Sequence, residues 1–128
     1  MGTKKVYVGI DVGKDWLDFA VSGIDKISRF GNHNQGIEKL VAQMEVLQPH
    51  LIAVEASGGY EAAFVDALML NELRVAVVNP TRVRALANAK GLLAKTDAID
   101  ARNIASYAEI IKPEPSKPRD DLDYVFGL

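Results

Sequence analysis

Cysteine is absent from this sequence of 128 residues, and histidine occurs only as His33 and His50. The absence of cysteine excludes disulfide bonds and thiolate-bound zinc, and two histidines offer few imidazole ligands. Any bound metal ion would therefore be held through oxygen atoms. Oxygen ligands favour magnesium, manganese or calcium over the softer transition metals.

Long apolar segments are also missing. No stretch approaches the roughly 20 residues that a membrane-spanning helix requires, and the N-terminus lacks the pattern of a signal peptide. We therefore expect a cytoplasmic protein with no membrane partner. The hydrophobic content of 48% is sufficient for a buried core, and 128 residues fit a single main domain.

An excess of positive charge is the third absence, because the formal net charge is -2. This value argues against a uniformly basic surface that coats nucleic acid, but it leaves room for a local one. Residues 79–102 carry five basic and two acidic side chains, a local charge of +3. The basic side chains are either contacts for a polyanion or residues of a solvated helix face. They are Arg82, Arg84, Lys90, Lys95 and Arg102.

The pattern of apolar residues divides the chain into two parts. Residues 5–10, 17–22 and 26–30 are predicted to form three consecutive antiparallel strands, separated by glycine-containing turns. The period then becomes helical over residues 37–47, after the capping side chains of residues 32–34 and before Pro49. A three-stranded meander followed by a helix is the result.

The second part alternates strands and helices. Strands are predicted over residues 51–55 and 74–78, with a helix over residues 60–73 between them. Pro80 begins a further helix that Gly91 interrupts, and Thr96 is a natural N-cap for a last helix with Asp97 and Asp100 in its first turn. The order βββαβαβα predicts an α/β fold of the ribonuclease-H-like kind. Its five-stranded mixed sheet has the order 3-2-1-4-5, with flanking helices.

Four acidic residues stand where this fold would bring them together. Asp11 and Glu55 end the first and fourth strands, which are parallel neighbours, and open sheets bind ligands beyond such ends. Asp97 and Asp100 are three positions apart, so a helix presents both on one face. Together the four carboxylates predict a site for two Mg²⁺ or Mn²⁺ ions that polarise a scissile phosphate.

Each acid also has a structural explanation. Asp11 precedes a turn, Glu55 precedes a glycine pair, and the two aspartates of the last helix complement its dipole. Three further acids compete as ligands, namely Asp15, Asp18 and Glu61. Ser57 and Tyr60 follow Glu55 and either orient a ligand or serve as cap and packing residues. Trp16 is assigned to the core.

Three blocks of sequence resemble the signature of a known family. They are Tyr7-Val8-Gly9-Ile10-Asp11-Val12, Glu55-Ala56-Ser57-Gly58-Gly59-Tyr60 and Lys95-Thr96-Asp97-Ala98-Ile99-Asp100-Ala101. The blocks resemble those of the DEDD insertion-sequence transposases of the IS110 family, which includes the Piv and MooV DNA invertases. The similarity spans residues 5–112, and the third block is the most specific.

The resemblance implies a RuvC-like N-terminal domain that binds Mg²⁺ through Asp11, Glu55, Asp97 and Asp100. It implies a recombinase that cuts and rejoins DNA and acts as a homo-oligomer when full length. It further implies a C-terminal domain with a serine nucleophile and, in insertion-sequence members, a bridge RNA encoded by the element. We expect residues 1–111 to be the catalytic domain and the Pro-rich residues 112–128 to be a linker and the truncated start of the next region. Such a fragment would be inactive alone.

Two other functions are consistent with the sequence. Residues 9–14 resemble the first phosphate loop of actin-like and sugar-kinase ATPases, although the chain has no room for their second lobe. Alternatively, the domain serves only in assembly, with an apolar helix face packed against another subunit. The residues of that face are Ala85, Leu86, Ala89, Leu92 and Leu93.

Overall fold

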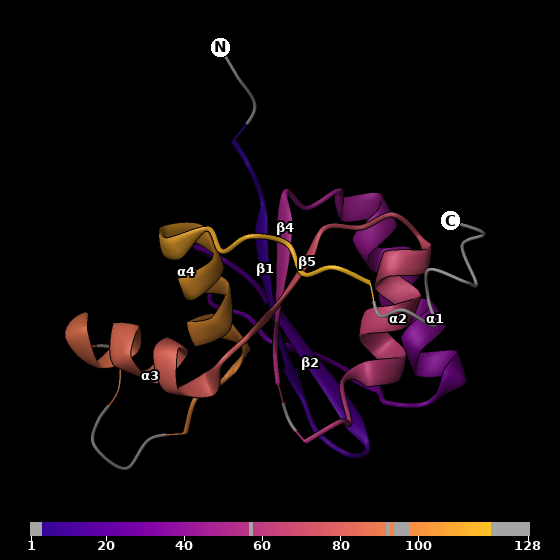
Figure 1. Ribbon diagram of the computed structural model, residues 1–128, viewed down its shortest axis with the longest axis horizontal. Coiled ribbons are helices and arrows are strands. Elements are labelled where there is room, and N and C mark those ends of the chain that lie inside the picture. Colours follow the sequence, from indigo (N-terminus) through magenta and orange to yellow (C-terminus); the bar gives the residue numbers. More distant parts are fainter. Residues whose placement is uncertain (1–3, 57, 92, 94–97, 119–128) are drawn as a thin grey trace.

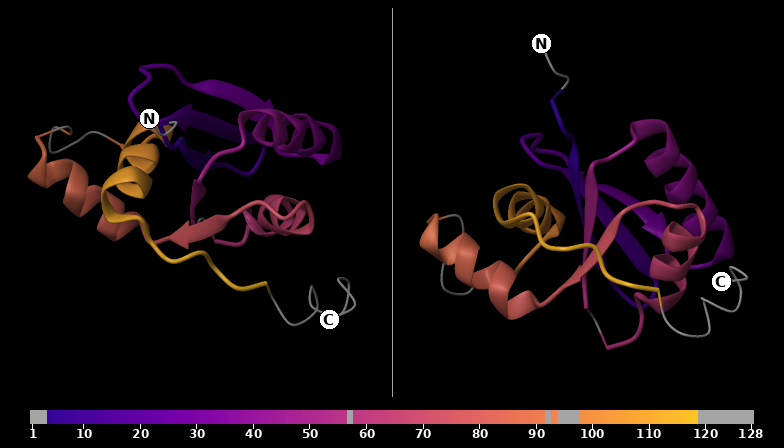
Figure 2. Two further views of the ribbon diagram at one scale, coloured as in Figure 1. Left: turned by 90° about the horizontal axis from the view of Figure 1, so that it is seen from above. Right: turned by 45° about the horizontal axis from the view of Figure 1, so that its top comes forward.

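A five-stranded sheet lies between two layers of helices in the computed structural model, which describes residues 4–56, 58–91, 93 and 98–118. Helices α1 and α2 cover one face, and α3 and α4 lie over the other (Figures 1 and 2). The strands are β1 (Tyr7–Val12), β2 (Trp16–Val21), β3 (Ser28–Gly31), β4 (Leu51–Glu55) and β5 (Val75–Val78). The helices are α1 (Asn34–Leu47), α2 (Ala62–Leu70), α3 (Pro80–Ala89) and α4 (Ala101–Ile111).

The strand order β3-β2-β1-β4-β5 confirms the predicted topology. β1 is central, pairing antiparallel with β2 and parallel with β4. Because helices cover both of its faces, β1 begins with four buried residues rather than an alternating pattern. Its observed bounds extend past residue 10, so Asp11 lies within the strand instead of after it. β2 and β3 are likewise displaced by one or two residues from the predicted segments.

The larger core lies between the sheet and the helices α1 and α2. Apolar residues of α1 recur with helical spacing on the buried face, as the sequence predicts. The largest fully buried side chains on this side are Ile10, Leu17, Leu40, Met44, Ile52, Phe64 and Leu68. This core fixes the positions of β1 and β4, the two strands that carry Asp11 and Glu55.

On the other face, α4 approaches β1 unusually closely at Gly9. A Cβ atom built on Gly9 would overlap backbone atoms of Ala101, Ile104 and Ala105. The helix presents small buried residues to the strand, and both Ala101 and Ala105 are fully buried. Glycine is therefore required at residue 9 by space, and the contact places the start of α4 beside the end of β1.

Two predicted helices have different bounds in the structure. The helix predicted over residues 60–73 is shorter, Ala62–Leu70, because Gly58 and Gly59 adopt positive φ angles before it. Glu72 is left-handed after it, with φ of 59°. The helix at Pro80 is confirmed, and the Asn79 side chain caps it by accepting a hydrogen bond of 2.8 Å from the Thr81 amide.

The segment after α4 runs over the outer edge of β5 (Figure 1). Lys112 is the C-cap of α4, and its backbone is left-handed with φ of 52°. Ser116 then donates its amide to the Val75 carbonyl at 2.7 Å and accepts from the Val77 amide through Oγ at 2.9 Å. The described part of the Pro-rich segment, residues 112–118, is thus attached to the sheet. Within the described ranges, no helix is long and apolar enough to cross a membrane.

Candidate metal centre

Asp11 and Glu55 lie side by side on neighbouring parallel strands. Ile10 of β1 is in register with Val54 of β4, so the next residue on each strand is one of the two acids. They open into one cleft of about 380 Å³ at the carboxyl end of these strands. The cleft is lined by Asp11, Glu55, Pro80, Thr81, Arg84, Ala98 and Ile99. The structure therefore brings together the two carboxylates that the sequence assigned to strand ends.

The electrostatics of this pair are unfavourable without a cation. Burial raises the pKa of Asp11 from 3.8 to about 6, with further contributions from repulsion by Asp18 and Asp100. Burial also raises the pKa of Glu55, and the Asp11 charge adds to it while Arg84 opposes it. Two partly buried carboxylates that repel each other in this way are relieved by a positive ion between them.

Asp18 and Arg29 continue this charged row across the sheet. Asp18 is the cross-strand partner of Asp11, and Arg29 is the cross-strand partner of Asp18. Arg29 donates from Nε and Nη2 to the Asp18 carboxylate at 2.7 and 3.0 Å, and its guanidinium lies over the Trp16 ring at 4.6 Å. Asp18 is thus held by an arginine. Trp16, assigned to the core from the sequence, instead packs partly exposed against Gly13 and Arg29.

Asp100 is the N-cap of α4, so the predicted position of this helix start was wrong. Its backbone is extended, with φ of -125° and ψ of -179°, and residues 98–100 are not helical. The Asp100 carboxylate accepts from the Arg102 amide at 2.9 Å, and Asn103 closes a capping box on the Asp100 amide. Asp100 therefore precedes α4 instead of lying within its first turn. Thr96, the predicted cap, and Asp97 lie outside the described residues.

The Asp100 charge is held by Arg102. The Arg102 Nη2 atom lies 2.7 Å from Asp100 Oδ2, and its Nη1 atom lies 2.6 Å from Asp25 Oδ1. Burial acts to raise the pKa of Asp100, but the hydrogen bonds from Arg102 and Asn103 outweigh it and lower the pKa. Asp100 is consequently ionised at neutral pH, near enough to Asp11 to raise the pKa of that residue.

The cap and the charge of Asp100 can be separated by substitution. We expect Asp100→Ala to lower the free energy of unfolding by about 1–2 kcal/mol, because the α4 amides lose their acceptor. Asp100→Asn should cost less than about 0.5 kcal/mol, since asparagine is an equally good N-cap. Urea denaturation of the metal-free variants measures both. Equal destabilisation by the two changes would mean that the Arg102 ion pair, rather than the cap, stabilises this helix start.

In the part of the chain that the structure describes, no three acidic or histidine side chains are grouped closely enough to hold a metal ion. The fourth predicted ligand, Asp97, is outside that part, as are Ser57 and Lys95. The chemistry of the described residues nevertheless fits a hard divalent cation. The donors are all carboxylate oxygens, and Asp11 and Glu55 line the same cleft with Asp100 within electrostatic reach.

The predicted basic residues have different surroundings. Arg84 lines the cleft, whereas Arg82 is exposed on α3. Lys90 donates to Ser106 Oγ at 3.2 Å, and Arg102 is bound to Asp100 and Asp25. Of the four predicted basic residues that the structure describes, Arg84 is the one that lines the cleft beside the acidic pair.

Asn32 is a site residue that sequence analysis considered only as a helix cap. Its Nδ2 atom donates to the Gly13 carbonyl at 2.9 Å and to the Tyr60 carbonyl at 3.1 Å. One amide group thus links the loop after β1 to the loop after β4, which follow Asp11 and Glu55. Tyr60 joins the site through its backbone, because 52% of this residue is exposed. No local sequence signal identifies such a link, since it depends on tertiary contact.

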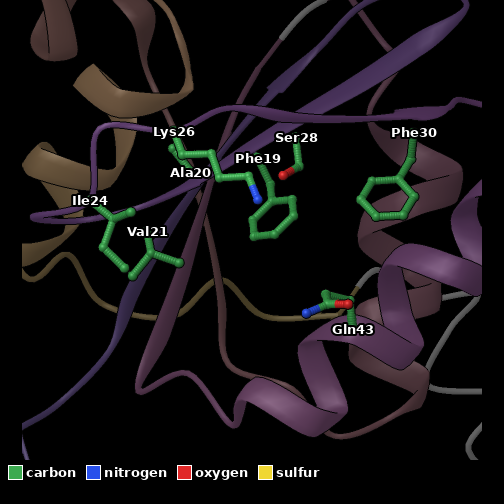
Figure 3. Close-up of a pocket in the computed structure, with 8 residues that line it drawn as sticks. All are labelled: Phe19, Ala20, Val21, Ile24, Lys26, Ser28, Phe30 and Gln43. Atoms are coloured by element: carbon green, nitrogen blue, oxygen red, sulfur yellow. The ribbon is translucent and has the colours of Figure 1, made fainter.

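A second groove lies on the opposite side of the sheet, between β2, β3 and α1 (Figure 3). Its volume is about 280 Å³, and it is lined by Phe19, Ala20, Val21, Ile24, Lys26, Ser28, Phe30 and Gln43. These lining residues include no acidic side chain, in contrast to those of the cleft at Asp11 and Glu55.

Comparison with known proteins identifies the family. A family model of the DEDD transposases of the IS110 family, described as transposase, matches residues 8–124. The chain belongs to this transposase family. The match includes the strands that carry Asp11 and Glu55 and continues beyond α4.

Relatives of this transposase domain include the pilin gene-inverting proteins of Moraxella lacunata and Moraxella bovis. Each is 30% identical over 124 residues, which cover 91% of this chain. The chain spans only 38% of the length of these relatives.

Solved structures confirm the fold. RuvC of T. thermophilus in complex with a Holliday junction substrate superposes with a TM-score of 0.59 and 18% identity, covering 88% of this chain and all of that one. A second Thermus thermophilus RuvC structure gives a TM-score of 0.56 at 18% identity, covering 87% of this chain and 99% of that one. The transposase domain therefore has the RuvC-like, ribonuclease-H-like fold predicted from its element order.

Proposed function

We propose that this chain is the catalytic domain of a DNA recombinase that cleaves and transfers DNA strands with a divalent metal held by Asp11, Glu55, Asp97 and Asp100. The observation that carries the proposal is the pair of adjacent carboxylates, Asp11 and Glu55, opening into a cleft beside Arg84. Membership of the DEDD transposase family supports it. The RuvC-like fold supports it further, because acids at these strand ends occupy the position where open sheets bind ligands.

The described residues have separate roles in this proposal. Asp11 and Glu55 provide oxygen ligands, and Asp100 contributes a third negative charge that remains ionised at neutral pH. When bound, two Mg²⁺ or Mn²⁺ ions would polarise the scissile phosphate and stabilise the leaving oxygen. Arg84 is placed to contact the DNA backbone at the cleft, which would make binding sensitive to salt. Additional backbone contacts are proposed for Arg82, Lys90, Lys95 and Arg102.

Branched DNA is the proposed substrate class. The RuvC structure with the same fold contains a Holliday junction, and the Moraxella relatives are described as gene-inverting proteins. Because the chain spans 38% of those relatives, we propose that complete strand exchange needs a longer homo-oligomeric protein with a serine nucleophile. We also propose that this longer protein uses a bridge RNA. The catalytic domain is proposed to end at residue 111.

The glycine turn after β1 favours this function over ATP binding. A Cβ atom on Gly13 would overlap the Trp16 indole, so this glycine accommodates aromatic packing. Close packing against an indole explains the glycine without a nucleotide phosphate. The resemblance of residues 9–14 to a phosphate loop therefore carries no independent evidence for a kinase-like function.

Glu55→Gln tests the proposal, with Glu61→Gln as its matched control. Glu61 is a nearby acid whose carboxylate accepts from the Gly59 amide at 3.0 Å and is absent from the cleft lining. We expect Glu55→Gln to weaken Mn²⁺ binding, measured by calorimetry, by at least about tenfold. Nicking of a four-way DNA junction in Mn²⁺, by the chain or by a longer protein containing it, should fall by about a hundredfold or more. The Glu61 variant should retain both properties.

Equal Mn²⁺ affinity in the wild type and the Glu55 variant would contradict the metal site. The 128-residue chain could bind the metal without nicking DNA, while the longer protein nicks it. That result would support the proposal that this domain is catalytic only in a larger assembly.

A further inference from the structure

A third pocket lies at the opposite end of the sheet from the metal cleft. Its volume of about 480 Å³ exceeds that of the metal cleft, and it is lined by the segments that precede β1, β4 and β5. We call it the basic pocket; its residues are Lys4, Lys5, Val6, Leu47, Gln48, Pro49, His50 and Arg74. Since β1, β4 and β5 are parallel, their amino ends meet here and their carboxyl ends meet at Asp11 and Glu55. In Figure 1 this end lies toward the marked N-terminus.

The basic pocket concentrates positive charge on a chain whose net charge is -2. Its lining has three basic side chains and a histidine, and no acid. Partial burial and repulsion from Lys5, Arg74 and Lys112 lower the pKa of His50, which places all three cations within electrostatic reach of one imidazole. The described ranges contain no ion pair to Lys4, Lys5 or Arg74.

Lys112 extends this charge from the end of α4. Its Nζ atom lies 5.5 Å from the centre of the Tyr7 ring, and the His50 ring meets the same ring edge-on at 5.5 Å. The Lys112 ammonium also donates to the Glu109 carbonyl at 2.6 Å, which fixes its position. Cations from three separate segments therefore converge around His50: Lys4 and Lys5 before β1, Arg74 before β5, and Lys112 after α4.

We propose that the basic pocket binds the phosphodiester backbone of a second nucleic-acid segment, separate from the one at the metal cleft. Convergent lysine and arginine side chains without neighbouring acids are suited to a polyanion, and phosphate contacts need no sequence information. The six residues of β1 span about 20 Å at roughly 3.3 Å per residue, so the two sites are well separated. If the protein joins two DNA molecules, the basic pocket would hold a segment that is not being cut; that role rests on the proposed function. The binding of nucleic acid at the basic pocket does not depend on it.

The single tryptophan of the chain provides a local reporter. Trp16 begins β2 and packs against Gly13, directly after the strand that carries Asp11. We therefore expect its emission to change when nucleic acid binds at the metal cleft, and not when it binds at the basic pocket. Fluorescence anisotropy of a labelled nucleic acid, in contrast, measures binding at either place.

The test compares Lys5→Gln with Arg74→Gln, singly and combined, in buffer containing EDTA. Lys39→Gln, an exposed lysine on α1 outside the pocket lining, is the matched control for charge. A labelled DNA duplex and a single-stranded RNA of equal length serve as separate probes. We expect each single change to weaken binding of the preferred probe about threefold or more. The double change should weaken it about tenfold or more and reduce the salt slope by about 2.

Several outcomes separate this proposal from that of the metal site. The double variant should keep wild-type Mn²⁺ affinity and the DNA-induced change in Trp16 emission, because the cleft is intact. Preference for the duplex or for RNA identifies which nucleic acid supplies the backbone. Equal anisotropy and equal salt slopes for the wild type, the double variant and the Lys39 variant would overturn the proposal, as would the absence of binding to either probe. A failure of Glu55→Gln to affect Mn²⁺ binding would leave these results unchanged.

Discussion

Asp11→Asn is expected to stabilise the metal-free chain and to abolish its stabilisation by Mn²⁺. The pKa of Asp11 is raised from 3.8 to about 6, which corresponds to about 3 kcal/mol of unfavourable free energy for its ionised form. Because the carboxylate is only half-buried, solvent screening reduces this to roughly 1–2 kcal/mol. Asparagine carries no charge, so it removes the cost of burying the carboxylate and the smaller repulsion from Asp18 and Asp100. The melting temperature without metal should therefore rise by about 3–8 °C. The same change removes an oxygen ligand, so the shift caused by Mn²⁺ should disappear.

The pH dependence of this effect has a defined sign. Below about pH 4 the Asp11 carboxyl is protonated in both the folded and the unfolded state, so it does not affect stability. Between about pH 4 and pH 6 the folded state holds the proton more tightly. Its stability therefore falls as pH rises, and the full penalty is present above about pH 6. The gain in melting temperature from Asp11→Asn should accordingly appear across this range and then level off.

Asp15→Asn is the matched control for this experiment. Asp15 is an exposed acid in the turn after β1, and it is not part of the cleft lining. Differential scanning fluorimetry of both variants, with and without Mn²⁺ from pH 4 to 8, gives the complete comparison. A wild-type response to Mn²⁺ in Asp11→Asn, or a metal-free variant less stable than the wild type at pH 7, would contradict our assignment of Asp11.

Gly9→Ala is expected to be the most damaging small substitution in the sheet. Alanine at a strand position normally gains about 0.5–1 kcal/mol over glycine. Here the added Cβ overlaps the backbone of α4 at Ala101, Ile104 and Ala105, which cannot move without displacing the helix. Overpacking against the backbone should cost about 3 kcal/mol or more, which outweighs the gain. Urea denaturation measures the loss. A weaker Mn²⁺ response is also expected, because Asp100 moves with the start of α4.

The double variant Gly9→Ala with Ala105→Gly distinguishes two explanations of that loss. If only side chains collided, removal of the Ala105 methyl group would restore stability. Since the overlapping atoms of α4 are backbone atoms, we expect no recovery, and a further cost of about 1 kcal/mol for glycine within a helix. Recovery of wild-type stability would show that the approach of α4 to β1 is less strict than the structure indicates.

The strand order and the pairing of Asp11 with Glu55 could be predicted because both follow from element order. Neighbouring parallel strands deliver the residues at their carboxyl ends to one edge, whatever the details of packing. The start of α4 was mispredicted because Thr96 and Asp100 are both good caps, and the side chain of Asn103 favours the later one by closing the capping box. A choice between two competing caps depends on such reciprocal contacts.

Contacts between distant segments were beyond the reach of the sequence. Trp16 was assigned to the core from its apolar character, but in the structure it supports Arg29 beside Asp18. The cross-strand row of Asp11, Asp18 and Arg29 requires the exact register of β1, β2 and β3. Periodicity does not determine that register, and a shift of one residue would move every side chain of a strand to the other face of the sheet. The link from Asn32 to the loops after β1 and β4 depends on tertiary contact in the same way.

The attachment of Ser116 to β5 bears on how the folded protein avoids self-association. An edge strand with free amides and carbonyls is a template for strand pairing between molecules, and natural proteins shield such edges. Ser116 satisfies the Val75 carbonyl and the Val77 amide on that margin of the sheet. In a chain that ended with α4, these two backbone groups would lack their hydrogen-bond partners and could pair with another molecule. We therefore expect residues 112–118 to protect the edge of the sheet against aggregation.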